Sequence, residues 1–198
     1  MKATWRRKMA ETKRQMVLEA VAPLFEKEGF SAVRMQDVAA GLGISVGALY
    51  KLYPSKEALF HAYVGHQISA FAEELALRCE GVAEPTAALA VFVALKFEVF
   101  RQKRKAIEDP AAGDPLFFLK LNTRQNEAAR PVYEFLADRF RAVAAEMPLV
   151  ESDMLKMAYL FNAYTTGYVE HWLQNADEKL DERPENVVRA FLNGHRRV

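Results

Sequence analysis

The stretch that decides the fold is residues 29–59, which read GFSAVRMQDVAAGLGISVGALYKLYPSKEAL. Apolar positions and glycines divide it into two short helical segments, about 35–41 and 46–52, which the helix breaker Gly43 separates. Ser45 stands where it can cap the second segment, because a serine oxygen accepts the free N–H groups of a helix start. Two short helices joined by a glycine-containing turn predict a helix-turn-helix.

Helical signals continue on both sides of this stretch. Upstream, Thr12 and Gln15 have the spacing of a capping box, and Gly29 ends the helix that they begin. Downstream, Ser55 caps a long helix to about residue 80. The run 86–106 alternates in part like a strand, but its length favours a buried helix, and no second strand is plausible. We therefore expect an all-α chain, with further helices at about 116–127, from Pro131 to about 147, at 152–175 and at 184–194.

Charge is distributed unevenly along this chain of 198 residues, whose net charge is only +1. Residues 1–60 hold ten Lys/Arg and six Asp/Glu, a net of +4, whereas residues 61–198 hold 17 and 20, a net of −3. A basic end on a mildly acidic body indicates one surface for an anionic partner, although plain scatter of surface charge would give the same totals. The basic residues Lys2, Arg6, Arg7 and Lys8 either add phosphate or minor-groove contacts or form a disordered tail.

Cysteine content and hydropathy limit the class of protein. The single cysteine, Cys79, excludes an internal disulfide and fits a reducing compartment. No stretch approaches 18 uninterrupted apolar residues, the length that a membrane span needs, and no apolar signal core follows the basic N-terminus. We expect a cytoplasmic protein.

The second short helix has the chemistry of a helix that enters the major groove of double-stranded DNA. Gly47 and Ala48 lack bulk, so the backbone can approach the base edges. Val46 and Ala48 would pack on thymine methyl groups, and Lys51 would reach a phosphate or a guanine. The expected DNA-binding residues are Gln36, Ser45, Val46, Gly47, Ala48, Tyr50, Lys51 and Lys56.

From Thr12 to Leu59 the chain resembles the DNA-binding domain of the TetR family of bacterial regulators. The shared order is Gly-Phe at 29–30, Asp-Val-Ala at 37–39, Gly-Ile-Ser-x-Gly-x-Leu-Tyr at 43–50 and Ser-Lys-Glu at 55–57. The resemblance implies an all-helical homodimer of about nine helices per chain. It implies a three-helix DNA-binding domain at 1–60, a larger ligand-binding and dimerisation domain at 61–198, and repression at a palindromic operator that a small-molecule effector relieves.

Three positions depart from the usual pattern of this family. Val33 and Arg34 stand where a serine or threonine often caps the second helix. Leu52 replaces a histidine or tyrosine and lacks the group for one phosphate contact. Gln36 replaces an arginine and would hold a base edge or a phosphate more weakly.

The second domain is crowded with aromatic side chains, most of which must form its core. Asn162 and two threonines interleave with Tyr159 and Tyr164, an apolar setting with few polar groups that suits a small, largely apolar ligand. The expected ligand-binding residues are Phe100, Phe117, Arg124, Tyr133, Tyr159, Asn162 and Thr166. A ligand wedged between the helix that begins at Lys56 and its neighbours at 86–106 and 116–127 would tilt that helix as a lever and alter the spacing of two DNA-binding helices.

The helix at 152–175 is apolar around much of its circumference and needs cover on more than one side. Packed with the helix at 185–193 against their symmetry mates, it would form a four-helix dimer interface, which the resemblance also implies. The expected interface residues are Phe161, Tyr164, Gly167, Tyr168, Val188 and Phe191.

The sequence predicts neither a catalytic site nor a bound metal or cofactor. His61 and His66 are five residues apart, which turns them to different faces of a helix. The glycine-rich run 41–47 has the wrong spacing for a dinucleotide-binding loop, and no strand precedes it. The alternative to a regulator is a helical ligand-binding protein or enzyme with an incidental helix-turn-helix, which turnover of a metabolite would favour.

Overall fold

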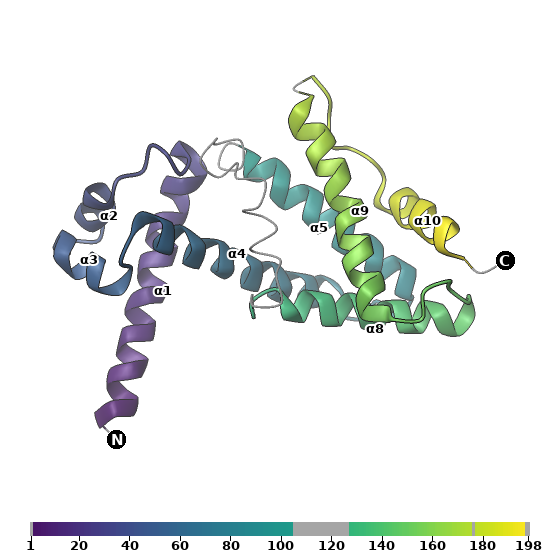
Figure 1. Ribbon diagram of the computed structural model, residues 1–198, viewed down its shortest axis with the longest axis horizontal. Coiled ribbons are helices and arrows are strands. Elements are labelled where there is room, and N and C mark those ends of the chain that lie inside the picture. Colours follow the sequence, from purple (N-terminus) through teal and green to yellow (C-terminus); the bar gives the residue numbers. More distant parts are fainter. Residues whose placement is uncertain (1, 105–126, 176, 197–198) are drawn as a thin grey trace. The chain divides into compact units, whose positions relative to one another are not determined.

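The computed structural model describes residues 2–104, 127–175 and 177–196 (Figure 1). Over these ranges the chain is all-helical, as predicted, and its one β feature is an isolated bridge between Leu149 and Arg196. The expected helix at 116–127 lies outside the described residues. The helices are α1 (Lys2–Glu28), α2 (Met35–Gly41), α3 (Val46–Leu52), α4 (Lys56–Arg78), α5 (Pro85–Gln102), α8 (Arg130–Glu146), α9 (Met154–Gln174) and α10 (Pro184–His195).

The described residues fall into two compact units. Unit 1 extends to Gln67, and unit 2 comprises Ile68–Arg104 and the residues from 127 onward. Helix α4 begins in unit 1 and ends in unit 2. The boundary between the units therefore lies within a helix, and the division at residues 60 and 61 stays a prediction.

Unit 1 is built from α1, α2, α3 and the first turns of α4 (Figure 1). Each helix contributes one apolar face to a common core, and each fully buried large side chain there contributes about 1.5–3 kcal/mol. The ring of Phe25 packs edge-on against that of Phe60, with 4.9 Å between centroids. The main core residues are Val17, Val21, Phe25, Val38, Leu49 and Leu59.

The beginning of α1 differs from the sequence prediction. Thr12 lies inside the helix, where its hydroxyl donates to the carbonyl oxygen of Lys8 at 3.0 Å, so it caps nothing. Gln15 bonds the Glu19 carboxylate instead of a helix start. The predicted capping box is therefore wrong: the residues before Thr12 are mostly good helix formers, and the helix continues through them. Gly29 ends α1 with a φ of 81°, as predicted.

Unit 2 contains a second core, to which α5, α8, α9 and α10 contribute. Helix α8 packs along α9, and α10 packs along α5. The predicted buried helix is α5, and the strand alternative for that run is wrong. Four phenylalanine rings meet in the centre of this core, on α5, α8, α9 and α10: Phe92, Phe140, Phe161 and Phe191.

Candidate nucleic-acid interface and ligand domain

Local signals fix the position of α3. Gly43 adopts a φ of 64° in the turn between α2 and α3, a conformation that costs a glycine little. The Ser45 hydroxyl then accepts the N–H of Ala48 at 3.1 Å, so the predicted N-cap is confirmed. Leu49 is fully buried beneath the helix and Tyr53 is nearly so, which anchors α3 on the unit 1 core.

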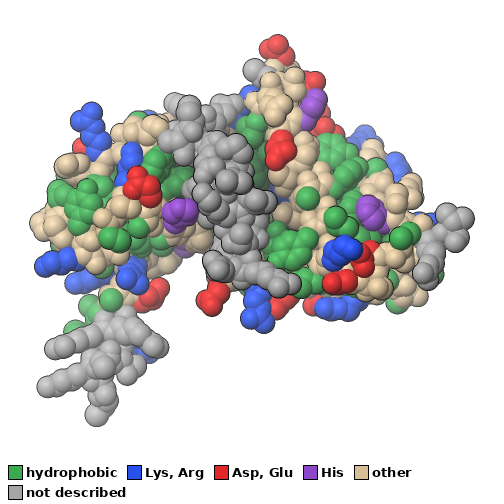
Figure 2. All heavy atoms as spheres, viewed as in Figure 1, with side chains coloured by type: hydrophobic (Ala, Val, Ile, Leu, Met, Phe, Trp, Pro, Cys, Tyr) green, Lys and Arg blue, Asp and Glu red, His purple; other side chains and the backbone are tan. Residues whose placement is uncertain are grey.

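The opposite face of α3 is open to solvent. Gly47 and Lys51 are exposed, and a Cβ added at Gly47 would meet no atom within 4 Å. Tyr50 is 45% exposed although it is a large aromatic residue. Val46 and Ala48 are half-buried at the edge of this face. Figure 2 shows Lys and Arg side chains on the visible surface of unit 1. Helix α3 thus presents small, aromatic and basic residues to solvent.

The departures from the usual TetR pattern that the sequence showed lie at the start of α2 and at the end of α3. Arg34 occupies the N-cap position and makes no side-chain cap, as the missing serine or threonine predicts. Gln36 is exposed in the first turn of α2, where an amide can donate and accept hydrogen bonds. Leu52 is half-buried against the core of unit 1, so its side chain contributes to packing.

Lys56 has a different role from the predicted phosphate contact. Its ammonium group donates to three backbone carbonyl oxygens in the loop between α1 and α2, at 2.9 Å to Phe30, 3.2 Å to Ser31 and 3.0 Å to Val33. It also lies 4.4 Å from the centre of the Phe30 ring. Three acceptors match the three hydrogens of the ammonium, so Lys56 holds the loop that positions α2 and is occupied by the protein itself.

A buried lysine in unit 2 gathers several of the predicted ligand-binding residues. The Lys96 ammonium lies 2.9 Å from the carbonyl oxygen and 3.0 Å from Oδ1 of Asn162. The hydroxyls of Thr165 and Thr166 accept from it at 2.9 and 2.7 Å. All four acceptors are neutral groups on α9. Burial lowers the pKa of Lys96 to about 7, and the more distant carboxylate of Glu170 opposes that shift.

The same cluster extends from Asn162 toward the surface. The Asn162 amide donates to the Tyr133 hydroxyl at 3.0 Å, and the Tyr133 ring stacks on that of Tyr159 at 4.0 Å between centroids. Burial raises the pKa of Tyr133 to about 12, so the phenol stays protonated. Tyr159 is 36% exposed. Four predicted residues therefore lie together, around a lysine that the sequence analysis missed.

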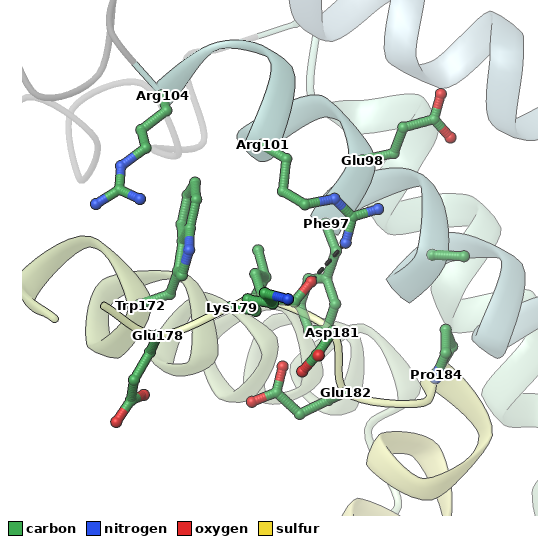
Figure 3. Close-up of a pocket in the computed structure, with 12 residues that line it drawn as sticks. Phe97, Glu98, Arg101, Arg104, Trp172, Glu178, Lys179, Asp181, Glu182 and Pro184 are labelled. Atoms are coloured by element: carbon green, nitrogen blue, oxygen red, sulfur yellow. Dashed lines mark hydrogen bonds between the residues drawn. The ribbon is translucent and has the colours of Figure 1, made fainter. Parts of the chain in front are cut away.

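The other predicted ligand-binding residues are not gathered there. Phe100 packs at the edge of the unit 2 core, and Phe117 and Arg124 lie outside the described residues. A separate hollow of about 690 Å³ lies between the end of α5 and the segment that joins α9 to α10 (Figure 3). None of the predicted residues lines it.

Figure 3 shows cationic, acidic and aromatic side chains together around this hollow. The Arg104 guanidinium lies over the Trp172 ring, 4.6 Å from its centre, and Arg101 donates to the carbonyl oxygen of Leu180 at 2.5 Å. Carboxylates such as Asp181 and Glu182 stand at its rim. Arg104 already covers one face of Trp172, and Arg101 already bonds the backbone. These groups are therefore engaged within the protein and less available to a ligand.

Half of the predicted dimer interface lies in the core of a single chain. Phe161 is fully buried, and Val188 and Phe191 are each 3% exposed. These three assignments are therefore wrong, because α5 and α8 supply the cover that the sequence analysis assigned to a partner. Gly167 is exposed with open space around it, and Tyr164 and Tyr168 are half-buried.

No described helix is long and apolar enough to cross a membrane. The described ranges likewise hold no group of three or more His, Cys, Asp or Glu side chains placed to bind a metal ion.

Comparison with known proteins identifies unit 1 as a bacterial regulatory domain. Residues 17–63 match the model of the family described as bacterial regulatory proteins, tetR family. This match covers the second half of α1, all of α2 and α3 and the first turns of α4, the elements that position the open face. Over residues 17–63 the chain is similar to the TetR family.

Curated relatives match over part of the chain. The HTH-type transcriptional regulator RutR of Escherichia coli (strain K12) is 31% identical over 125 residues, which are 61% of this chain and 58% of RutR. The uncharacterized HTH-type transcriptional regulator YerO of Bacillus subtilis (strain 168) is 31% identical over 102 residues, 48% of this chain and 34% of YerO. The chain thus spans less than two thirds of the length of these relatives.

Solved structures match over nearly the whole chain at low identity. FadR of Bacillus subtilis in complex with stearoyl-CoA is 15% identical with a TM-score of 0.68, over 91% of this chain and 98% of FadR. A putative regulator of Saccharomonospora viridis in complex with choline is 16% identical with a TM-score of 0.68, over 95% of this chain and all of that one. These matches show the fold: an N-terminal helix-turn-helix followed by a helical domain.

Proposed function

We propose that this protein is a transcriptional regulator that binds double-stranded DNA through α2 and α3 and binds a small effector in unit 2. The observation that carries the proposal is the open face of α3. Its core side is anchored by Leu49, whereas Gly47 and Lys51 face open space. A short helix with a small, basic and uncovered face fits a major groove. The expected DNA contacts are Gln36, Ser45, Val46, Gly47, Ala48, Tyr50 and Lys51.

Selection of genomic fragments tests the proposal. The protein is incubated with sheared genomic DNA of its source organism, and the retained fragments are sequenced. We expect enrichment of a two-fold symmetric sequence whose half-sites are about one helical turn apart, because a dimer presents two α3 helices. Retention of fragments without a shared sequence would reject specific regulation.

The dimer that such a site requires is proposed to form through the exposed side of α9. Gly167 offers a close approach between helices, and Tyr164 and Tyr168 flank it with hydroxyls 3.1 Å apart. Placing a charge at Gly167 changes this surface without disturbing the core beneath it.

The effector is proposed to bind in unit 2, beside the Lys96 cluster. The related solved structures hold stearoyl-CoA in one case and choline in the other, so this fold accepts ligands of different chemistry. Here Tyr133 and Tyr159 supply apolar surface, while Asn162 and Thr166 supply hydrogen-bonding groups already held in position by Lys96. This arrangement suits a mainly apolar molecule with one polar end.

The effector is proposed to release DNA by acting on α4, the helix that begins in unit 1 and ends in unit 2. Thermodynamic reciprocity gives a test, since an effector that weakens DNA binding must itself bind less tightly when DNA is present. A coupling of about 1–3 kcal/mol changes affinity roughly 5–150-fold. Calorimetric titration with and without operator DNA measures it, and equal affinities would exclude the lever.

The alternative, an enzyme or ligand-binding protein with an incidental helix-turn-helix, is less well supported. It leaves the open face of α3 without a role, and the matched relatives are transcriptional regulators.

A further inference from the structure

The first half of α1 is an extension that the core of unit 1 does not use. Among the side chains described in α1, the first buried one is Val17, and every residue from Lys8 to Met16 is exposed. Residues 2–16 are hereafter the α1 extension. At 1.5 Å per residue it is about 22 Å long. A helix of this length outside a core needs another reason to be present.

The α1 extension is strongly basic. Residues 2–14 contain six Lys/Arg and one Asp/Glu, a net of +5, which exceeds the net charge of the whole chain. Lys8, Lys13 and Arg14 are exposed, and none of the three forms an ion pair with another described residue. Concentrated positive charge, with no ion pair at the three described cations, favours a polyanion as the ligand.

The structure ties the α1 extension to the end of α3. Tyr53 is the C-cap residue of α3, and its buried hydroxyl donates to the backbone carbonyl oxygen of Arg14 at 3.2 Å. In Figure 1 the N-terminal half of α1 continues beyond α3. The C-terminal end of the α1 extension therefore lies beside the end of the proposed recognition helix.

We infer that the α1 extension is a second DNA-binding element, which contacts the phosphates beside each half-site. The inference rests on the proposed function, because α3 must first bring DNA to unit 1. Charge complementarity and continuity with the open face of α3 select DNA as the occupant. Trp5, Met9 and Met16 are also exposed on this helix, so a second copy of the chain is the competing occupant that the test must separate.

Salt dependence of DNA binding tests the inference. The probe is a labelled duplex of about 30 base pairs that carries the selected two-fold site, titrated from about 50 to 200 mM salt. The variant combines Lys8→Gln, Lys13→Gln and Arg14→Gln, all at exposed positions. The matched control combines Arg130→Gln, Arg141→Gln and Lys179→Gln, which makes the same charge change at exposed positions of unit 2.

The log–log slope of affinity against salt falls by about 0.9 for each lost phosphate contact. We expect the slope to decrease by about 1–3 in the extension variant, with roughly tenfold weaker binding at low salt, and no decrease in the control. Equal slopes in wild type and extension variant would overturn the inference. A change in sedimentation with an unchanged slope would assign the helix to self-association and overturn it too.

Different outcomes of this test would reject the proposed function and the role of the α1 extension. If wild type itself does not bind the duplex, regulation by DNA binding is rejected. If wild type binds and Lys51→Ala weakens it while the extension variant behaves as wild type, only the role of the α1 extension is rejected.

Discussion

The two units place the residues of their candidate sites in opposite environments. Unit 1 leaves Gly47, Tyr50 and Lys51 of α3 facing open space, whereas unit 2 takes the ammonium of Lys96 into its core. Residues on an exposed face can be substituted without lowering the stability of the fold, so we expect such substitutions to change DNA affinity. A buried cation opposes folding unless its hydrogen bonds are complete, so we expect its substitution to change the free energy of unfolding.

The largest expected effect comes from the core of unit 2. Phe161→Ala should lower the free energy of unfolding by about 3–5 kcal/mol, because the ring is fully buried among aromatic neighbours. Gly167→Asp, on the exposed side of the same helix, should leave stability unchanged and yield monomers. Urea unfolding and sedimentation measure the two effects. Full stability in Phe161→Ala would mean that this ring is not core.

The largest expected effect in unit 1 is on DNA binding. Gly47→Leu should weaken specific binding by about 100-fold, or about 2.7 kcal/mol, because the side chain would occupy the space between α3 and the bases. The melting temperature should not fall, since a Cβ there meets nothing within 4 Å. Gly65→Leu in α4 is a matched control with similar space. Fluorescence anisotropy with operator DNA measures the affinity of both variants. Equal affinities would contradict this role of α3.

Lys96 should make the stability of unit 2 depend on pH. Burial lowers its pKa in the folded chain to about 7, whereas a lysine in an unfolded chain titrates near pH 10.4. Between these values the unfolded chain holds a proton that the folded chain has released, so stability rises with pH from about 7 to about 10.

Lys96→Met should remove this rise and add about 1–4 kcal/mol at pH 6, because an apolar side chain of similar length avoids the buried charge. Urea unfolding across this pH range measures both effects. Parallel profiles for wild type and variant would show that Lys96 does not titrate in this window.

The smallest expected effect separates two lysines of unit 1. Lys51→Ala should reduce the salt slope of DNA binding by about 1 without changing the melting temperature. Lys56→Ala should lower the melting temperature, because three carbonyl oxygens lose their donor, and should leave the slope unchanged. The reverse pattern would restore Lys56 as a phosphate contact.

Unit 1 could be predicted from its sequence because local chemistry determines it. Gly43 supplies the turn and Ser45 the cap, and each acts on its own neighbours in the chain. Thr12 misled the prediction, because the same hydroxyl can bond a carbonyl inside a helix as easily as an N–H at its start.

Unit 2 could be predicted only in outline because tertiary contacts determine its details. The apolar spacing of Phe161 and Phe191 shows that both need cover, but it does not say whether the same chain or a partner supplies it. Lys96 interrupts an apolar run and has the signature of a solvated position. Its hydroxyl and amide partners on α9 lie more than sixty residues away, where no local pattern reveals them.

The most direct test of the account is the ratio of specific to non-specific DNA affinity. Anisotropy titrations compare wild type on a duplex that carries the selected two-fold site and on one with the half-sites scrambled, at the same salt. The account predicts at least about 10³-fold tighter binding to the intact site, lost in Gly47→Leu. Equal affinities for the two duplexes would contradict the claim that α3 reads DNA sequence.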